Sequence, residues 1–162
     1  MALVPSVLEA GLLSVLTSKP RAAAQAARLM ANAYADYTRT AQAGTALPVF
    51  LGTESQGLQQ ALLSAMAAPS AGNPSLMANA WFTGVTAFWT TSFAPVIFSD
   101  GVNTGPPLPA GASSVVGCLT PVFSNVANTD QSAASQMAAC IDTATRAITV
   151  TLLPSGVTVP LS

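Results

Sequence analysis

A shortage of charge constrains this chain more than any other feature of its sequence. Only 7% of the residues are Asp, Glu, Lys or Arg, against about 25% in a typical soluble domain. No charged residue lies between Glu54 and Asp100, between Asp100 and Asp130, or after Arg146. The surface must therefore be rich in uncharged polar residues or be covered by neighbouring subunits. The second alternative fits better, because 51% of the residues are hydrophobic in a chain of only 162.

The few basic residues do not form a nucleic-acid site. The formal net charge is −1, whereas binding to nucleic acid requires several basic residues to neutralise phosphates. Arg21, Arg28 and Arg39 fall in one predicted helix, but they are spread over its turns and Asp36 lies among them. This pattern is typical of a solvated helix face, so we expect no nucleic-acid partner.

Two apolar segments raise the question of secretion or membrane insertion. The segment from Met1 to Thr17 lacks a basic start and contains Glu9, which argues against a signal peptide. Residues 80–98 are uncharged, but they include Gly84, Pro95 and several Thr and Ser, and their second half is β-branched and aromatic. We expect a strand there, and a membrane-associated protein using residues 80–98 is an alternative.

The first 45 residues predict a pair of helices. Pro5 and Ser6 open the first helix, and Pro20 suits the first turn of the second. Hydrophobic residues at helical spacing predict one buried stripe on each helix. These are Leu8, Leu12, Leu13 and Leu16 on the first, and Ala23, Ala27, Met30, Tyr34 and Tyr37 on the second.

A weak internal duplication follows the helical pair. Residues 77–91 (MANAWFTGVTAFWTT) match residues 137–151 (MAACIDTATRAITVT) at an offset of 60, and Leu62-Leu63 meets Cys118-Leu119 at an offset of 56. Each unit predicts a helix, a capped turn, a second helix and a strand. The helices begin at Gln56 and Ala112, the caps are Asn73 (before Pro74) and Asp130, and the strands are Phe88–Phe98 and Ile148–Leu153.

These elements predict a single, mainly helical α+β domain over residues 1–162. The helical pair (1–45) precedes two αα-hairpin-plus-strand units (53–99 and 112–153), whose strands form a small sheet. Residues 100–111 are expected to be a Pro/Gly-rich contact loop without regular structure. Residues 154–162 are expected to return as a strand or to leave as an arm.

The residue types needed for catalysis are scarce. The chain has no histidine, which removes the Ser-His-acid and Cys-His schemes, the common proton shuttle and most catalytic zinc sites. Its only lysine, Lys19, lies between two predicted helices, and no two of its six carboxylates are close in sequence. Asp142 is expected to pair with Arg146. We expect no enzyme activity, cofactor, metal or small-molecule substrate. The alternative is a small binding module or enzyme with a site built from Ser, Thr and Asp, for which Asp100, Asp130 and Asp142 are the best candidates.

Cys118 and Cys140 lie eleven residues before and after Thr129, the middle of the second predicted turn. Two helices folded back on that turn would place the cysteines opposite each other. Their expected equivalents in the first unit, Leu62 and Ala80, are apolar, which favours buried thiols in a helix interface. A disulfide formed after assembly or release from the cell is the alternative.

Six aromatic residues gather within eighteen positions, and core packing is favoured over a ligand-binding box. They are Trp81, Phe82, Phe88, Trp89, Phe93 and Phe98. In the predicted strand, Phe88 and Trp89 would point to opposite faces, one of them towards a neighbouring subunit. The candidate contact residues are Asp100, Pro106, Pro107 and Pro109 in the loop, Trp89 and Phe93 in the strand, and Pro154, Val157 and Pro160 in the tail.

Several segments together resemble a known family. They are the opening MALVPSVLEAGLLSVLTS, the alanine-rich helix ending in Tyr34 and Tyr37, the AGNP turn and the late DTATRAITVT. This chain resembles the small, low-charge virion structural proteins of contractile-tailed bacteriophages. The resemblance covers most of the chain. It implies an oligomeric part of the neck, tail or baseplate, assembled in the host cytoplasm, with copies of itself and other virion proteins as partners.

Overall fold

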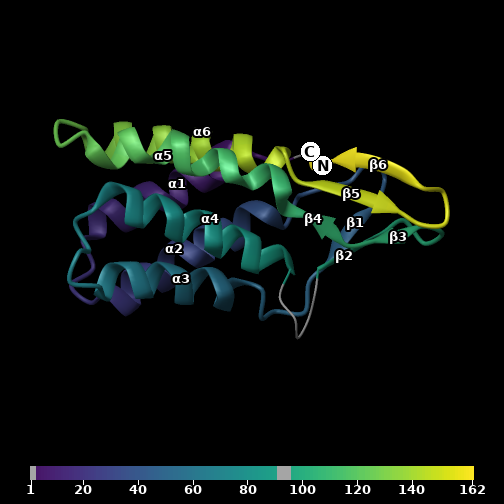
Figure 1. Cartoon of the computed structure of the whole chain (residues 1–162), viewed down its shortest axis with the longest axis horizontal. Coiled ribbons are helices and arrows are strands. Elements are labelled where there is room, and N and C mark those ends of the chain that lie inside the picture. The colour runs from purple at the N-terminus through teal and green to yellow at the C-terminus, as the bar shows by residue number, and fades with distance from the viewer. Residues whose placement is uncertain (1–2, 91–95) are drawn as a thin grey trace.

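The computed structural model describes residues 3–90 and 96–162, and this part of the chain is mainly helical (Figure 1). Its α-helices follow one another as three antiparallel hairpins, and this confirms the predicted helical α+β class. The helices are α1 (Pro5–Ser18), α2 (Ala23–Thr38), α3 (Ser55–Ala67), α4 (Pro74–Thr90), α5 (Ser114–Ser124) and α6 (Asp130–Arg146), with a short 3-10 helix, η1 (Pro109–Ser113), before α5.

The strands form two antiparallel sheets of three strands, both at one end of the helices (Figure 1). The first sheet has the order β1-β2-β3, and the second has the order β4-β5-β6. Thr104 and Leu153 exchange backbone hydrogen bonds of 2.8 Å, which link the sheets. The strands are β1 (Leu47–Val49), β2 (Ile97–Ser99), β3 (Thr104–Gly105), β4 (Pro107–Leu108), β5 (Thr149–Leu152) and β6 (Val157–Pro160).

Several predicted boundaries were wrong. Phe88 and Trp89 belong to α4 and not to a strand, because burial of both rings among the helices overrides their β propensity. The strands that follow the two hairpins, β2 and β5, lie in different sheets. The loop at 100–111 contains β3, β4 and part of η1, while the tail returns as β6.

The helix caps were predicted in part. Asn73 caps α4 as expected, since its side-chain oxygen accepts a 2.9 Å hydrogen bond from the Ser75 amide. In α6 the cap is Thr129, which accepts from the Ser132 amide, and Asp130 is the first helical residue. Its carboxylate is still favourable there, next to the positive end of the helix dipole.

The helices close into a ring in which α1 packs on both α2 and α6. The second helix of each hairpin is the inner one, with seven buried residues against three in the first helix. The three outer helices share one burial pattern, with spacings of four and three residues. It consists of Leu8, Leu12 and Val15 in α1, Leu58, Leu62 and Ala65 in α3, and Val115, Leu119 and Val122 in α5.

The inner helices also share a pattern, so the repeat is threefold and includes the N-terminal pair. In each of them six buried residues have spacings of 3, 3, 1, 3 and 1. They are Ala27, Met30, Ala33, Tyr34, Tyr37 and Thr38 in α2; Ala78, Trp81, Gly84, Val85, Phe88 and Trp89 in α4; and Ala134, Met137, Cys140, Ile141, Ala144 and Thr145 in α6. Equivalent buried residues of α4 and α6 are 56 positions apart in the sequence. The sequence match at an offset of 60 is therefore out of register with this repeat by about one helical turn.

A continuous chain of hydrogen bonds joins the three inner helices. Trp89 Nε1 donates to the Tyr34 hydroxyl at 2.8 Å, and that hydroxyl lies 3.1 Å from Thr145 Oγ1. Thr145 donates its own proton to the Ile141 carbonyl at 2.8 Å, so Tyr34 must be the donor to Thr145. Burial raises the pKa of Tyr34 well above its usual value, which keeps this donor protonated.

Replacing Thr145 with valine tests this chain of hydrogen bonds. Thr145→Val keeps the shape of the side chain but leaves the buried Tyr34 hydroxyl without its acceptor, which should lower the free energy of unfolding by about 1–3 kcal/mol. Thr143→Val is the matched control, because Thr143 also bonds to the carbonyl four residues before it but is exposed. The control should change the free energy by less than about 0.5 kcal/mol. Equal effects in urea unfolding would contradict the assignment.

Candidate functional site

The end of the molecule that carries both sheets is its most unusual surface. We call it the β end and define it as residues 42–53, 96–108 and 148–162. Its three segments are joined by strand pairing within each sheet, by the Thr104–Leu153 link, and by the pairing of Gln42 with Ser162. Phe98 fastens it to the helices by stacking on Trp89, with ring centroids 5.9 Å apart and planes 24° apart.

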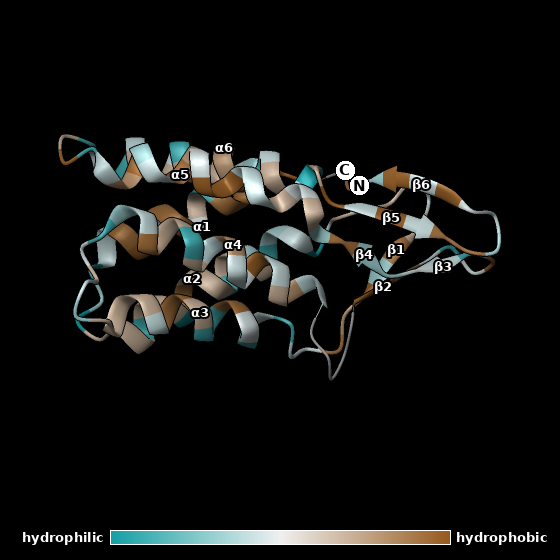
Figure 2. Cartoon of the chain, viewed as in Figure 1, coloured by the Kyte–Doolittle hydropathy of each residue, from teal (hydrophilic) through white to brown (hydrophobic). Residues whose placement is uncertain are grey.

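The β end exposes hydrophobic side chains that would normally be covered. Among the described residues, eight of the eleven exposed large hydrophobic side chains lie on it. They are Leu47, Val49, Leu51, Ile97, Val102, Leu108, Leu153 and Val157, each 41–78% exposed. Its strands are mainly brown or pale in Figure 2, whereas teal positions recur along the helices. Exposed apolar surface gathered in this way is typical of a contact site.

The β end also carries almost no charge. Asp100 is its single charged residue, and the other ten charges of the chain lie elsewhere. The Asp100 carboxylate is occupied by its own turn, where it accepts from the amides of Asn103 at 2.6 Å and Val102 at 2.9 Å. These hydrogen bonds hold the pKa of the Asp100 carboxyl below its usual range. The charge therefore fixes a hairpin turn and is not free to select a charged partner.

The structure brings several of the predicted contact residues together on this surface. Pro106, Pro154, Val157 and Pro160 are exposed on the β end with Asp100, and Pro109 is half-buried next to it. Two predictions were wrong. Trp89 is fully buried because it donates to Tyr34, and Pro107 is buried in β4 where it pairs with Val150. Phe93 lies outside the described residues.

The sequence interpretation missed the β1 part of the surface. Leu47, Val49 and Leu51 are at least 53% exposed, although hydrophobic residues in a short extended piece usually face a core. The signal that could have revealed them is the alternation in Leu47-Pro48-Val49-Phe50-Leu51, which places three aliphatic side chains on one face of a strand.

Cys118 and Cys140 form a disulfide with Cα atoms 5.6 Å apart, so the prediction of free buried thiols was wrong. The sulfurs join α5 to α6, as the facing geometry predicted. In the threefold repeat their equivalents in the first hairpin are Gly11 and Ala33, which are also 22 residues apart. There the helices touch directly, since a Cβ on Gly11 would lie 2.7 Å from the Cβ of Ala33.

The carboxylates proposed for a binding module do not converge. Asp130 and Asp142 are separated by twelve residues of α6, about 18 Å along its axis. Asp142 accepts from Tyr37 at 2.5 Å and from Arg146 at 2.8 Å, and burial together with this carboxylate raises the pKa of Tyr37. Arg146 also donates to the Leu3 carbonyl at 2.9 Å, so this cluster holds α2, α6 and the segment before α1 together.

In the described part of the chain, no three His, Cys, Asp or Glu side chains lie close enough together to hold a metal ion. None of the helices in residues 3–90 and 96–162 has the length and hydrophobicity needed to span a bilayer. Within the apolar segment at 80–98, residues 80–90 belong to α4 and pack largely inside the ring, while residues 97–98 belong to β2.

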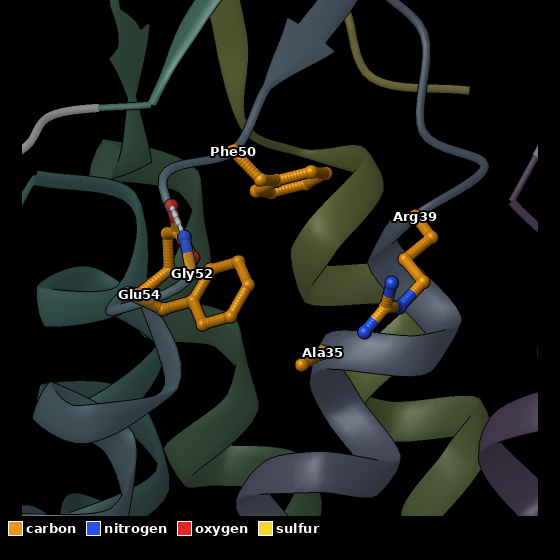
Figure 3. A pocket seen from close by; sticks show the side chains of 6 residues that line it. Ala35, Arg39, Phe50, Gly52 and Glu54 are labelled. Carbon is orange, nitrogen blue, oxygen red and sulfur yellow. Dashed lines mark hydrogen bonds between the residues drawn. The ribbon is translucent and has the colours of Figure 1, made fainter.

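A small pocket of about 210 Å³ lies where α2, α4 and the segment before α3 meet (Figure 3). Phe50 and Phe88 provide its apolar wall, and Arg39 enters from α2. Its polar groups already have partners. Glu54 accepts hydrogen bonds from the amides of Leu51 and Gly52, and Arg39 pairs with Asp36 at 3.1 Å.

Removing the disulfide should destabilise the chain. The disulfide closes a loop between two cysteines that are 22 residues apart in the sequence. The Cys118→Ser, Cys140→Ser double variant opens this loop, which should lower the free energy of unfolding by about 3 kcal/mol. A reducing agent should lower the stability of the parent protein by a similar amount and leave the double variant unchanged. A parent protein indifferent to reduction would show that the bond is not formed.

The Asp100 turn predicts a specific dependence on pH. The pKa of this carboxyl is lower in the folded state than in the unfolded chain, so its contribution is present above about pH 4 and is lost as the pH falls further. The stability difference between the parent and Asp100→Ala should therefore shrink in acid. Asp100→Asn, which keeps an acceptor oxygen but cannot titrate, is the control. A stability difference between the parent and Asp100→Ala that stays constant from about pH 2.5 to 6 would contradict the prediction.

Comparison of the chain with protein-family models, with curated proteins and with solved structures finds no match.

Proposed function

We propose that this chain is a non-enzymatic structural subunit of a larger assembly and that the β end is the surface by which it joins its neighbours. The observation that carries the proposal is the concentration of exposed hydrophobic side chains on a surface with a single charge. An apolar surface of this kind is unfavourable in water and becomes stabilising when a partner covers it.

The energies are large enough for association. Fully burying one Val, Leu or Ile side chain contributes about 1.5–3 kcal/mol. Eight such side chains, each roughly half exposed, would therefore contribute on the order of 6–12 kcal/mol when covered. Association costs about 4–15 kcal/mol in lost freedom of motion. The two ranges overlap, so the β end can supply a large part of what a specific contact requires.

We further propose that the assembly is the virion of a tailed bacteriophage, at its neck, tail or baseplate, built in the host cytoplasm. The resemblance of the sequence to small, low-charge virion proteins supports this choice. The compact ring of helices with a disulfide also suits a part that must persist outside the cell, where oxidising conditions favour such bonds.

Particle composition tests this function. Phage particles purified from the organism that encodes this chain should contain it at several copies per particle, as measured by quantitative mass spectrometry. The chain should stay with the particles through a density gradient and be released only when they are dismantled. Purified particles that lack the chain, together with a free pool of it in the lysate, would contradict the virion assignment.

A further inference from the structure

The β1–β2 sheet has two clearly different faces. Phe98 of β2 is buried and points towards the helices, while its neighbour Ile97 is exposed. Val49 of β1 lies directly opposite Ile97, and Leu47 lies two residues before Val49 in the same strand. Paired residues of an antiparallel sheet share a face, and every second residue along a strand returns to it. Leu47, Val49 and Ile97 therefore form one outward hydrophobic row, which we call the outer β1–β2 face.

The free edges of the sheets are poorly suited to a further strand. In the order β1-β2-β3 and β4-β5-β6, the edge strands are β1, β3, β4 and β6. Three of them contain a proline, Pro48, Pro107 and Pro160, which cannot donate a backbone hydrogen bond. β3 is linked to Leu153 through Thr104. A partner is therefore better accommodated by the side chains on the faces of these sheets than by an added strand.

The outer β1–β2 face is suited to meet a copy of itself. A contact about a twofold axis places the same patch on both sides, so a charged patch would oppose itself. This one is uncharged, and nearby Asp100 is engaged by its own turn. A charged partner, by contrast, would find no complementary charge here. The three segments of the β end have seven exposed residues each, so residues around the outer β1–β2 face are available to widen the contact towards the roughly 20–30 per side of a standard interface.

We infer that the partner of the β end is a second copy of this chain, which packs its outer β1–β2 face against the same face of the first about a twofold axis. This inference rests on the proposed function, because it names the partner of the same surface. It adds a symmetric pair of subunits as the building block and places Val49 and Ile97 at its centre.

Charge placed on this face should separate the pair. Val49→Asp and Ile97→Asp should each raise the dissociation constant measured by sedimentation equilibrium at least about thirtyfold, the loss typical of a central contact. Val126→Asp is the matched control, since Val126 is fully exposed at the α5–α6 turn, far from the β end. Val49 is itself 53% exposed, so its variant should keep the parent's helical circular dichroism and unfolding temperature.

Cross-linking identifies the contact independently of affinity. With a short bismaleimide and no reducing agent, Val49→Cys should give dimers with itself and with Ile97→Cys, while Val126→Cys and the parent should not. Self-association that survives Val49→Asp, or equal cross-linking at 126, would overturn the inference while the assembly role stands. A parent that is monomeric at every concentration would also overturn it. The assembly role then depends on particle composition alone, where recovery with another virion protein would identify a different partner.

Discussion

The hydrogen bonds from Trp89 to Tyr34 and from Tyr34 to Thr145 tie the three inner helices together at one level of the ring. A buried polar group is costly unless it is paired, so each of the three side chains fixes the rotation of its helix relative to the other two. Because the rotation of α2, α4 and α6 is fixed, the direction in which each of these helices points at its C-terminal end, towards the strands, is fixed as well. Phe98 extends the same arrangement into the first sheet by stacking on Trp89. The position of the β end therefore depends on this small network.

The threefold repeat explains how so little charge and so much alanine can specify one arrangement. Each hairpin repeats the same buried positions, with small residues where the helices approach most closely. The residues that break the symmetry are those that specify the register: Tyr34 and Trp89 in the centre, and Cys118 with Cys140 at the position that Gly11 and Ala33 occupy. A repeat of plain alanines and leucines could slide by a turn, whereas these pairs fit in one register only.

Much of the helical framework could be predicted, because it follows from local spacing. Hydrophobic periodicity, Pro74 and Asn73 located the helices and one cap. The third copy of the repeat was missed, since alanine-rich helices match equally well one turn out of register. The end of α4 was also missed, because packing of Phe88 and Trp89 against Tyr34 and other helices decides the conformation there. Strand order could not be read from the sequence, because it depends on contacts between distant segments.

The candidate surface was predicted in outline and corrected in detail. Loop and tail residues such as Pro106 and Val157 are exposed, as their turn-rich surroundings indicate. Core packing of the aromatic cluster that contains Trp89 was predicted, but Trp89 was also expected to lie at a contact, because which face of an element meets the ring depends on the fold. The exposure of Val49 was missed although the alternation around β1 indicates it. Hydrogen exchange of the free chain and of the chain inside purified particles tests the central claim most directly. We expect amides at 42–53, 96–108 and 148–162 to gain protection on assembly, while those of the inner helices stay unchanged. Protection gained on the outer helices, with the β end unaltered, would contradict this account.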